Sequence, residues 1–422
     1  MRMPSTALLA ALLATACGAP ATSSDGGAVA DSGTGVDAGS RPPAADAGEQ
    51  DAGVPDAGTV DAGCARVLAP ADAPRVVAVS HPFPSDGGSR DNRYELFTLS
   101  SDGTLTPRGE EFRMRRASGA AGFITFTPDG KVGLAPQDDG SLGVFRVEAD
   151  GGVTVVHAAY AGGFSAGQVL VEPSGARAWV TDFNVQANGG GLYSVDIGCD
   201  GSLSNPRRVL AGNNASAAAW IEPGGRALVA SRSLGTSPVD QDVHVADLDA
   251  GTVLASTTAF PDRDAIPPTV SISADGRWVA LPDTSYFVPQ QRVAFLELVG
   301  GAPVARQVLD VDSPVGVAFS PFGSGGLLVQ SDATDAFRRV TFNGSSFAIS
   351  SNTLSYAHGR PQLPTPPVVL ERGALRGRVL VGELDALRQL QFNQDGSITD
   401  VSKTKVSGSG SAQVVGSIGV SP

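Results

Sequence analysis

The sequence predicts an all-β fold, a seven-bladed β-propeller with four antiparallel strands per blade. Three observations predict it. The composition combines 53 Gly and 29 Pro with only 17% charged residues, which favours short strands joined by tight turns over long helices. Tight-turn signals recur about every fifty residues, a period typical of propeller blades. The chain also ends on half of a hairpin, Gly416 to Pro422, and the missing half is found near residue 75.

The chain begins with a secretory signal. A single arginine precedes an apolar run from Ala7 to Ala14, which is too short to span a bilayer as a permanent helix. The segment "LATAC" ends at Cys17 and resembles a lipobox, so residues 1–16 are predicted to be removed and Cys17 to be lipidated. Ordinary secretion after the small residues "ATA" is the alternative. Gly18 follows the predicted lipidated cysteine, and a glycine at this position, rather than an aspartate, is typical of lipoproteins that are sorted to the outer membrane.

Residues 17–63 are predicted to be a disordered acidic tether. They are dominated by Ala, Gly, Asp, Ser and Pro, with "DAG" repeated, and they contain no aromatic residue. Such a segment cannot bury enough apolar surface to offset its loss of chain entropy. Like charges along it repel one another and favour an extended spacer over a calcium-binding repeat.

Seven apolar strands each lead into a pair of residues that tolerates positive φ, as two-residue hairpin turns require. One of them is "YELFTLS", which precedes Asp102-Gly103. We expect these hairpins to be the two outer strands, C and D, of each blade. The turns are Asp102-Gly103, Asp150-Gly151, Asp200-Gly201, Asp249-Ala250-Gly251, Gly300-Gly301, Asn343-Gly344 and Asp395-Gly396.

A second series lies between these hairpins. Each member is a small-apolar strand, a tight turn and another apolar strand, as in "FITFTPDGK" from Phe123 and "VSISADGRWVALPD" from Val270. These are expected to be the inner strand A and its neighbour B. Inner strands are predicted at residues 122–127, 168–172, 217–222, 268–273, 315–320, 366–370 and 416–421.

The last inner strand, 416–421, has no strand after it, and the first blade has no inner strand before it. We therefore expect the C-terminal strand to complete the N-terminal blade, which closes the ring without an exposed sheet edge. The propeller is predicted to cover residues 64–422. A β-sandwich is the alternative, but its strands would not repeat in groups of four.

The turn motifs "FTPDGK" and "FSPFG" and the hairpins "YELFTLSSDGTLTP" and "GLYSVDIGCDGSLSNP" carry a resemblance. Over roughly residues 70–422 the chain resembles the YVTN and lactonase-like propeller superfamily. The resemblance implies a propeller fold and makes lactone hydrolysis the enzymatic precedent. These motifs specify a blade and not a chemistry.

The candidate binding face lies where strand B ends, because the B–C and D–A loops are longer and more polar than the glycine turns at the other face. Five of the seven strand-end residues are acidic, which predicts a ring of carboxylates around one mouth of the channel that could hold calcium. Solvated Asp residues are also common at loop ends. The strand-end residues are His81, Asp138, Asp182, Arg232, Asp283, Asp332 and Glu383, and the D–A loops add His358 and Arg360.

The resemblance also implies looking for the His, Arg and Glu groups of lactonase-like propellers near the channel. Proline stands where the histidine before the inner strands is expected, as in "PTPPVVLE". If the protein is a hydrolase, a general acid–base pair could come from His81, His358 and Arg360, which are predicted on the loop side. Ser165 in "GFSAG" matches a serine-hydrolase pattern, but a strand follows it where that pattern requires a helix. No catalytic or metal-binding residue is assigned from the sequence.

Three cysteines occur in the chain. With Cys17 lipidated, Cys64 and Cys199 remain in an oxidising compartment, so a disulfide between them is expected. It would tie the N-terminal segment to the C–D turn of the third blade. Two unpaired thiols are the alternative.

The charge excludes one class of partner, because a formal net charge of −13 and the lack of any basic run do not fit nucleic-acid binding. The sequence predicts a monomeric outer-membrane lipoprotein, facing the periplasm or the cell surface, that touches the membrane only through its lipid. Its propeller is expected to bind a protein, a glycan or a small molecule. A lactone hydrolase, with or without a divalent metal, is the alternative.

Overall fold

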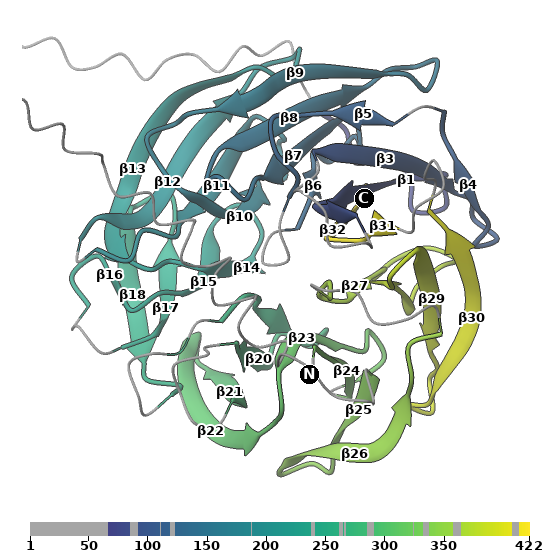
Figure 1. Ribbon diagram of the computed structural model, residues 1–422. Helices are drawn as coiled ribbons and strands as arrows, with labels where there is room; N and C mark the ends of the chain where they lie inside the picture. The colour runs from purple at the N-terminus through teal and green to yellow at the C-terminus, as the bar shows by residue number, and fades with distance from the viewer. Residues whose placement is uncertain are drawn as a thin grey trace, which may run out of the picture.

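The computed structural model describes residues 66–84, 92–109, 111–118, 123–186, 188–237, 241–260, 265, 267–284, 291–323, 325–331, 337–357, 364–406 and 413–422. The elements in these ranges are β-strands, and seven sheets surround a central axis as a seven-bladed β-propeller (Figure 1). The predicted fold class is confirmed. No helix in the described ranges is long and apolar enough to cross a membrane.

Each blade is an antiparallel sheet whose strands are called A to D from the axis outward. Blade 1 contains β32 (Ser417–Val420), β1 (Arg75–His81), β3 (Arg93–Leu99), β4 (Leu105–Pro107) and β5 (Phe112–Arg113). Blade 2 contains β6 (Thr125–Phe126), β7 (Val132–Pro136), β8 (Leu142–Val147) and β9 (Val153–Tyr160). Blade 3 contains β10 (Ala166–Val171), β11 (Arg177–Asp182), β12 (Gly190–Ile197) and β13 (Leu203–Asn213), with β16 (Ser233–Leu234) paired to β13.

The remaining blades follow the same order. Blade 4 contains β14 (Ala217–Glu222), β15 (Arg226–Ala230), β17 (Val243–Asp247) and β18 (Thr252–Thr257). Blade 5 contains β19 (Ser271–Ile272), β20 (Trp278–Asp283), β21 (Arg292–Val299) and β22 (Ala302–Asp310). Blade 6 contains β23 (Pro314–Phe319), β24 (Gly326–Gln330), β25 (Phe337–Phe342) and β26 (Phe347–Leu354). Blade 7 contains β27 (Val368–Val369), β28 (Arg378–Gly382), β29 (Ala386–Phe392) and β30 (Ile398–Lys405), and β2 (Phe83–Pro84) pairs with β31 (Gln413–Val414).

The C-terminal strand completes blade 1, as the sequence predicts. β32 pairs antiparallel with β1, in a register that runs from Val77 opposite Val420 to Ser80 opposite Ser417. The hairpin half at the end of the chain thus finds its partner strand at the beginning of the propeller. We call this junction the seam.

Side chains at the A–B turns explain why these short sequences turn so sharply. In blade 2 the Thr127 hydroxyl donates to the Asp129 carboxylate at 2.7 Å, and Gly130 follows with a φ of 69° that favours glycine. Ser273 and Asp275 repeat the same contact at 2.5 Å in blade 5. The A–B and C–D turns lie on one face of the ring, the turn face, and the B–C and D–A loops lie on the other, the loop face.

The hydrophobic core lies between neighbouring blades. Tyr94 of blade 1 and Phe145 of blade 2 are fully buried in one cluster, and Phe97 of blade 1 and Leu380 of blade 7 are fully buried in another. The second cluster also holds Ile418 of the C-terminal strand. Burial of apolar surface between blades therefore closes the ring on both sides of the seam.

Candidate functional site

Four of the residues predicted at the strand B ends are buried. His81, Asp283 and Glu383 have no exposed surface, and Asp182 is 2% exposed. A buried charge requires partners, and each of these side chains has them inside the ring. We call these contacts the loop clasps, because several of them bind a D–A loop to the next blade.

Asp182 shows how a clasp works. Its carboxylate accepts hydrogen bonds from the backbone N–H of Ser165, at 2.9 Å, and of Asn184, at 3.2 Å. Ser165 lies in the D–A loop that enters blade 3 immediately before β10, and so the "GFSAG" motif leads into a strand. Burial raises the pKa of the Asp182 carboxyl, while the two N–H groups and Arg208 act in the opposite direction.

Asp283 and Glu383 are held by arginines of strand C. Arg292 donates to Asp283 at 3.0 Å, and Arg388 donates to Glu383 at 3.0 Å. Glu383 also accepts from the backbone N–H of Ala357, which belongs to the D–A loop from blade 6. At Asp182, Asp283 and Glu383 the expected ring of open carboxylates is therefore not found, because intramolecular partners occupy them.

His81 lies beside a buried carboxylate. Its Nε2 is 3.5 Å from Glu95 of β3, and both side chains are almost completely buried. This pair joins strands B and C of blade 1 and has no access to solvent. It is therefore poorly placed to exchange protons with a ligand on the loop face.

Two other predicted residues remain partly exposed on the loop face. The backbone N–H of Asp138 donates to Ala117 at 3.2 Å, and that of Arg232 donates to Asn213 at 2.9 Å. Through its backbone, Asp138 thus holds the D–A loop into blade 2, and Arg232 holds the end of β13, after which the D–A loop into blade 4 begins. Asp332, His358 and Arg360 lie outside the described residues, and their predicted part in binding stays a prediction.

Sequence reasoning missed the amide members of the clasp system. Gln137 accepts from the N–H of Arg116 at 2.9 Å and donates to Ala158 at 2.7 Å, and Gln330 donates to Asp312 at 2.7 Å. They stand one or two residues before the acidic positions that the strand ends suggested. Had the strand ends been compared as polar rather than as charged positions, the two glutamines would have been found.

Asp242 is another clasp that the sequence did not suggest. Its carboxylate accepts from the N–H of Ala259 at 2.6 Å and of Phe260 at 3.0 Å, which hold the D–A loop from blade 4 to blade 5. Burial raises the pKa of this carboxyl, and the nearby Asp283 acts in the same direction. Like the carboxylates of Asp182 and Glu383, the Asp242 carboxylate is bound by groups of the propeller itself.

The inner strands are joined by Gln168 of β10. Its amide donates to Pro268 of blade 5 at 2.7 Å and accepts from the N–H of Ala218 in blade 4 at 3.1 Å. One side chain from blade 3 thus reaches past blade 4 to blade 5 along the channel wall. In the part of the chain that the structure describes, no group of three His, Cys, Asp or Glu side chains is arranged to hold a metal ion.

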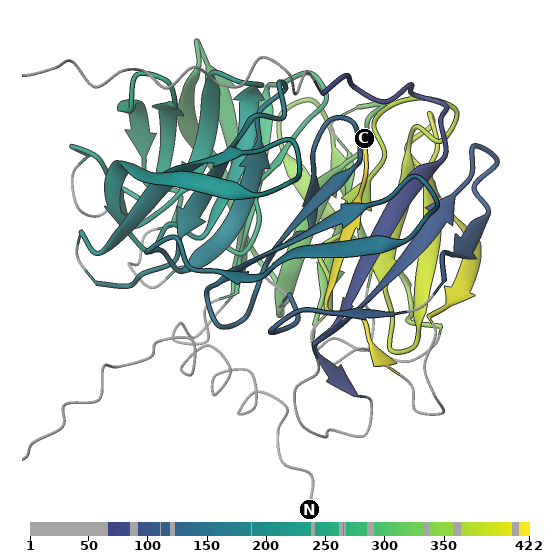
Figure 2. The ribbon, with the colours of Figure 1, turned by 90° about the horizontal axis from the view of Figure 1, so that it is seen from above.

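The N-terminal segment 66–74, here called the strap, lies across the turn face on the same side as the C-terminus (Figure 2). The N–H of Ala69 donates to Pro128 of blade 2 at 3.0 Å, and its carbonyl accepts from Arg372 of blade 7 at 3.1 Å. Asp72 accepts from the N–H of Ala374, also in blade 7, at 2.7 Å. The strap therefore bridges the blades on either side of blade 1.

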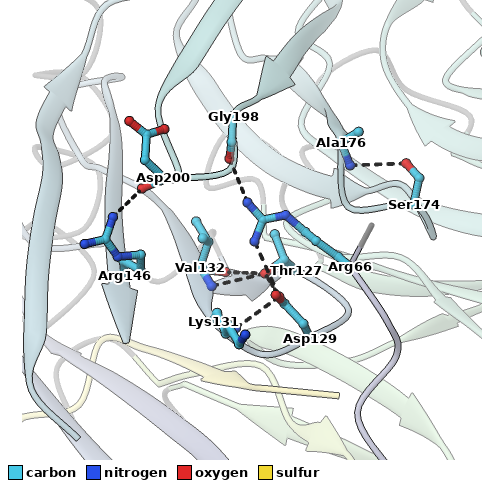
Figure 3. Close-up of polar contacts among 10 residues, drawn as sticks. All are labelled: Arg66, Thr127, Asp129, Lys131, Val132, Arg146, Ser174, Ala176, Gly198 and Asp200. Carbon is cyan, nitrogen blue, oxygen red and sulfur yellow. Dashed lines mark hydrogen bonds and ion pairs between the residues drawn. The ribbon is translucent and has the colours of Figure 1, made fainter. Parts of the chain in front are cut away.

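Arg66 holds the first described end of the strap between blades 2 and 3 (Figure 3). Its side chain is 5% exposed, donates to Gly198 at 2.7 Å and lies 3.5 Å from Asp129. Cys199, beside Gly198, is disulfide-bonded. Cys64 lies outside the described residues, so its pairing with Cys199 stays a prediction that the position of Arg66 supports.

Comparison with known proteins identifies the fold. No protein-family model and no curated protein matches the chain. A protein from Lactobacillus plantarum of solved structure has 10% identity and a TM-score of 0.58, over 82% of this chain and 99% of that one. The Pseudomonas aeruginosa periplasmic gluconolactonase PpgL has 14% identity and a TM-score of 0.54, over 81% and 99%. At these identities the likeness concerns the fold alone, and the seven-bladed propeller described above thus has a gluconolactonase among its structural neighbours.

Proposed function

We propose that the protein is a membrane-anchored, extracytoplasmic lipoprotein whose propeller is a rigid binding scaffold. The position of the strap carries the proposal. Because Arg66 and Ala69 are bound to turns of blades 2, 3 and 7, the preceding chain joins the ring on the turn face. An anchor at Cys17 therefore leaves the opposite loop face to a partner.

The loop clasps support the role of a rigid scaffold, because they fix the bases of the loops. They bind the loop face through buried groups such as Asp182, Gln330 and Glu383, so a partner meets loops whose bases are already ordered. Less ordering on association means a smaller entropic cost of binding. Asp138 and Arg232, partly exposed on this face, provide charges of both signs for a protein or glycan partner.

The anchor is tested by fractionating cells that express the wild type, Cys17→Ser or Cys64→Ser after metabolic labelling with an alkyne fatty acid. We expect label and membrane association in the wild type and in Cys64→Ser, and neither in Cys17→Ser. Membrane association of an unlabelled Cys17→Ser protein would contradict the proposed anchor.

The binding face is tested with a photo-crosslinking residue placed at Asp138 or Arg232 on the loop face, or at Glu222 or Asp275 on the turn face. We expect a discrete crosslinked partner from the loop-face positions only. Crosslinks from the turn face alone would reverse the assigned orientation.

A lactone hydrolase is the alternative, favoured by the likeness in fold to PpgL. Fold alone does not carry a chemistry, so the alternative rests on what the purified protein does. Sugar, aryl and homoserine lactones are offered to the Cys17→Ser protein with calcium or with chelator. If the protein hydrolyses a lactone and Asp138→Asn abolishes this activity, the protein is a hydrolase. If it hydrolyses no lactone under any condition, the binding scaffold remains as the proposed function.

A further inference from the structure

Blade 1 departs from the other blades in its outer strand. β4 and β5 both pair with β3, where Pro107 lies opposite Phe97 and Phe112 opposite Tyr94, so the outer strand of this blade is formed by two short elements. In blades 2–7 the outer strand is one element of 6 to 11 residues. The interruption lies at the rim, where β5 runs beside β9 of blade 2 (Figure 1).

An open cleft of about 610 Å³ lies at this interruption. Its volume falls within the range of small-molecule sites. Phe112 and Val153 provide its apolar surface and are packed against the core cluster of Tyr94 and Phe145. The Phe112 ring centroid lies 5.4 Å from that of Tyr94 and 5.0 Å from that of Phe145, so the ring is held in place from behind. The cleft residues are Arg108, Gly109, Glu111, Phe112, Asp150, Gly151, Gly152 and Val153.

Charged groups of both signs stand on the two walls. The Arg108 guanidinium from blade 1 lies over the C–D turn of blade 2, with Nη2 3.2 Å from where a Cβ at Gly151 would be. Asp150 of that turn accepts the N–H of Gly152 at 2.9 Å through Oδ1. Glu111 is paired with Arg93 at 3.2 Å. The cleft thus combines guanidinium donors, carboxylate acceptors and an aromatic ring.

We infer that this cleft binds a neutral saccharide. An anionic ligand would meet Asp150 and Glu111, and a cationic ligand would meet Arg108. A wholly apolar ligand would desolvate the polar walls without replacing their hydrogen bonds. A sugar ring has an apolar face for Phe112 and hydroxyl groups that both accept from Arg108 and donate to Asp150. This inference is independent of the proposed anchor and loop face, because the cleft is at the rim.

The test is saturation-transfer NMR of the purified Cys17→Ser protein with glucose, cellobiose, lactose and chitobiose. Glucuronate and glucosamine serve as charged analogues. We expect saturation transfer to the ring protons of at least one neutral sugar and weaker transfer to the charged analogues. The inference is overturned when no neutral sugar receives saturation, or when the charged analogues bind as well as the neutral ones.

Two substitutions locate the site. Arg108→Gln removes the guanidinium without touching the core and is expected to weaken binding about tenfold. Phe112→Ala is expected to weaken it further, and thermal unfolding checks that the variant is folded. Phe322→Ala, which alters a partly buried phenylalanine of blade 6, and Arg306→Gln, on the rim of blade 5, are the matched controls. Equal binding by Arg108→Gln and Arg306→Gln would exclude this cleft as the site.

Discussion

Blade 4 and blade 1 have the same strand order but are closed in different ways. In blade 4 a local turn joins β14 to β15, and Glu222 lies opposite Arg226. In blade 1, β32 and β1 come from opposite ends of the propeller, and the hydrogen-bonded residues Val76 and Ser421 are 345 positions apart. Closing a loop of that length costs about 4 kcal/mol more than closing the local turn, if closure entropy grows with the logarithm of loop length.

Contacts that blade 4 does not need offset this cost in blade 1. Arg75, only 5% exposed, donates to three carbonyls, those of Ala71 in the strap, Arg372 in blade 7 and Ser421 at the C-terminus. The strap stands where the other blades have a covalent A–B turn. Blade 1 is therefore closed by side-chain contacts at the seam, whereas the other blades are closed by a continuous chain between strands A and B.

Removal of the C-terminal strand should disrupt the closure of blade 1 more than any other change. Deleting residues 416–422 exposes the inner edge of β1 and removes Ile418, which is 1% exposed between blades 7 and 1. Unpaired strand edges associate, so we expect the truncated protein to form larger oligomers and aggregates than the full chain does, measured by size-exclusion chromatography with light scattering. Deletion of Pro422 alone is the control and should leave the size distribution of the full chain unchanged. If the longer deletion leaves both the size distribution and the melting temperature of the full chain unchanged, the seam is dispensable.

Acid should open blade 4 before it opens the seam. His244 of β17 is fully buried, with Nδ1 2.8 Å from the Ser256 hydroxyl and Nε2 2.9 Å from the Ser231 carbonyl. Burial lowers its pKa from 6.5 to about 4. The unfolded chain therefore binds the proton more tightly, so the stabilisation is complete above pH 6.5, declines as the pH falls and is lost below pH 4. The loss amounts to about 3 kcal/mol.

Unfolding of wild type and His244→Gln by urea between pH 4 and 7.5 measures this effect. The wild type should lose stability steeply over that range, and the variant should show a flatter profile. The direct partners of Arg75 and Ser421 at the seam are backbone carbonyl and N–H groups, so hydrogen exchange at β32 should change less than exchange at β17. Parallel profiles for the two proteins would remove His244 as the source.

The same comparison shows what sequence could predict and what it could not. Turn pairs such as Asp102-Gly103 and the unpaired strand at 416–421 reflect local backbone chemistry, so the seven blades and the seam were predictable. Side-chain partners were not, because they depend on which distant segments meet. From the sequence, the carboxylates of Asp182 and Glu383 were predicted to be open ligand groups, yet each accepts a backbone N–H from the D–A loop that enters its own blade, 17 and 26 residues earlier in the chain. Nothing local to Arg75 predicted its three carbonyl partners.

Loss of the Arg75 guanidinium should weaken the seam in particular. Arg75→Met keeps the aliphatic stem and removes the donors to Ala71, Arg372 and Ser421. We expect a loss of about 2 kcal/mol in the free energy of unfolding, since charge-assisted hydrogen bonds contribute roughly that much. Hydrogen exchange should quicken in β32 and β1 and stay unchanged in blade 4. Arg376→Met, whose guanidinium donates to Pro321 at 2.7 Å between blades 7 and 6, is the control and should leave β32 protected.

The smallest expected effect comes from the last residue before the C-terminal proline. The Ser421 hydroxyl accepts the N–H of Val76 at 2.8 Å, and the Ser421 N–H donates to the Val76 carbonyl at 2.8 Å, so this pair extends the β1–β32 ladder by one side-chain bond. Ser421→Ala leaves the buried N–H of Val76 without its acceptor and should cost about 1 kcal/mol in the free energy of unfolding. In the double variant with Arg75→Met the losses should be less than additive, because both side chains hold the same end of the same strand. Strict additivity would mean that Arg75 acts mainly through blade 7 and the strap, and the seam would then be a joint of two independent parts.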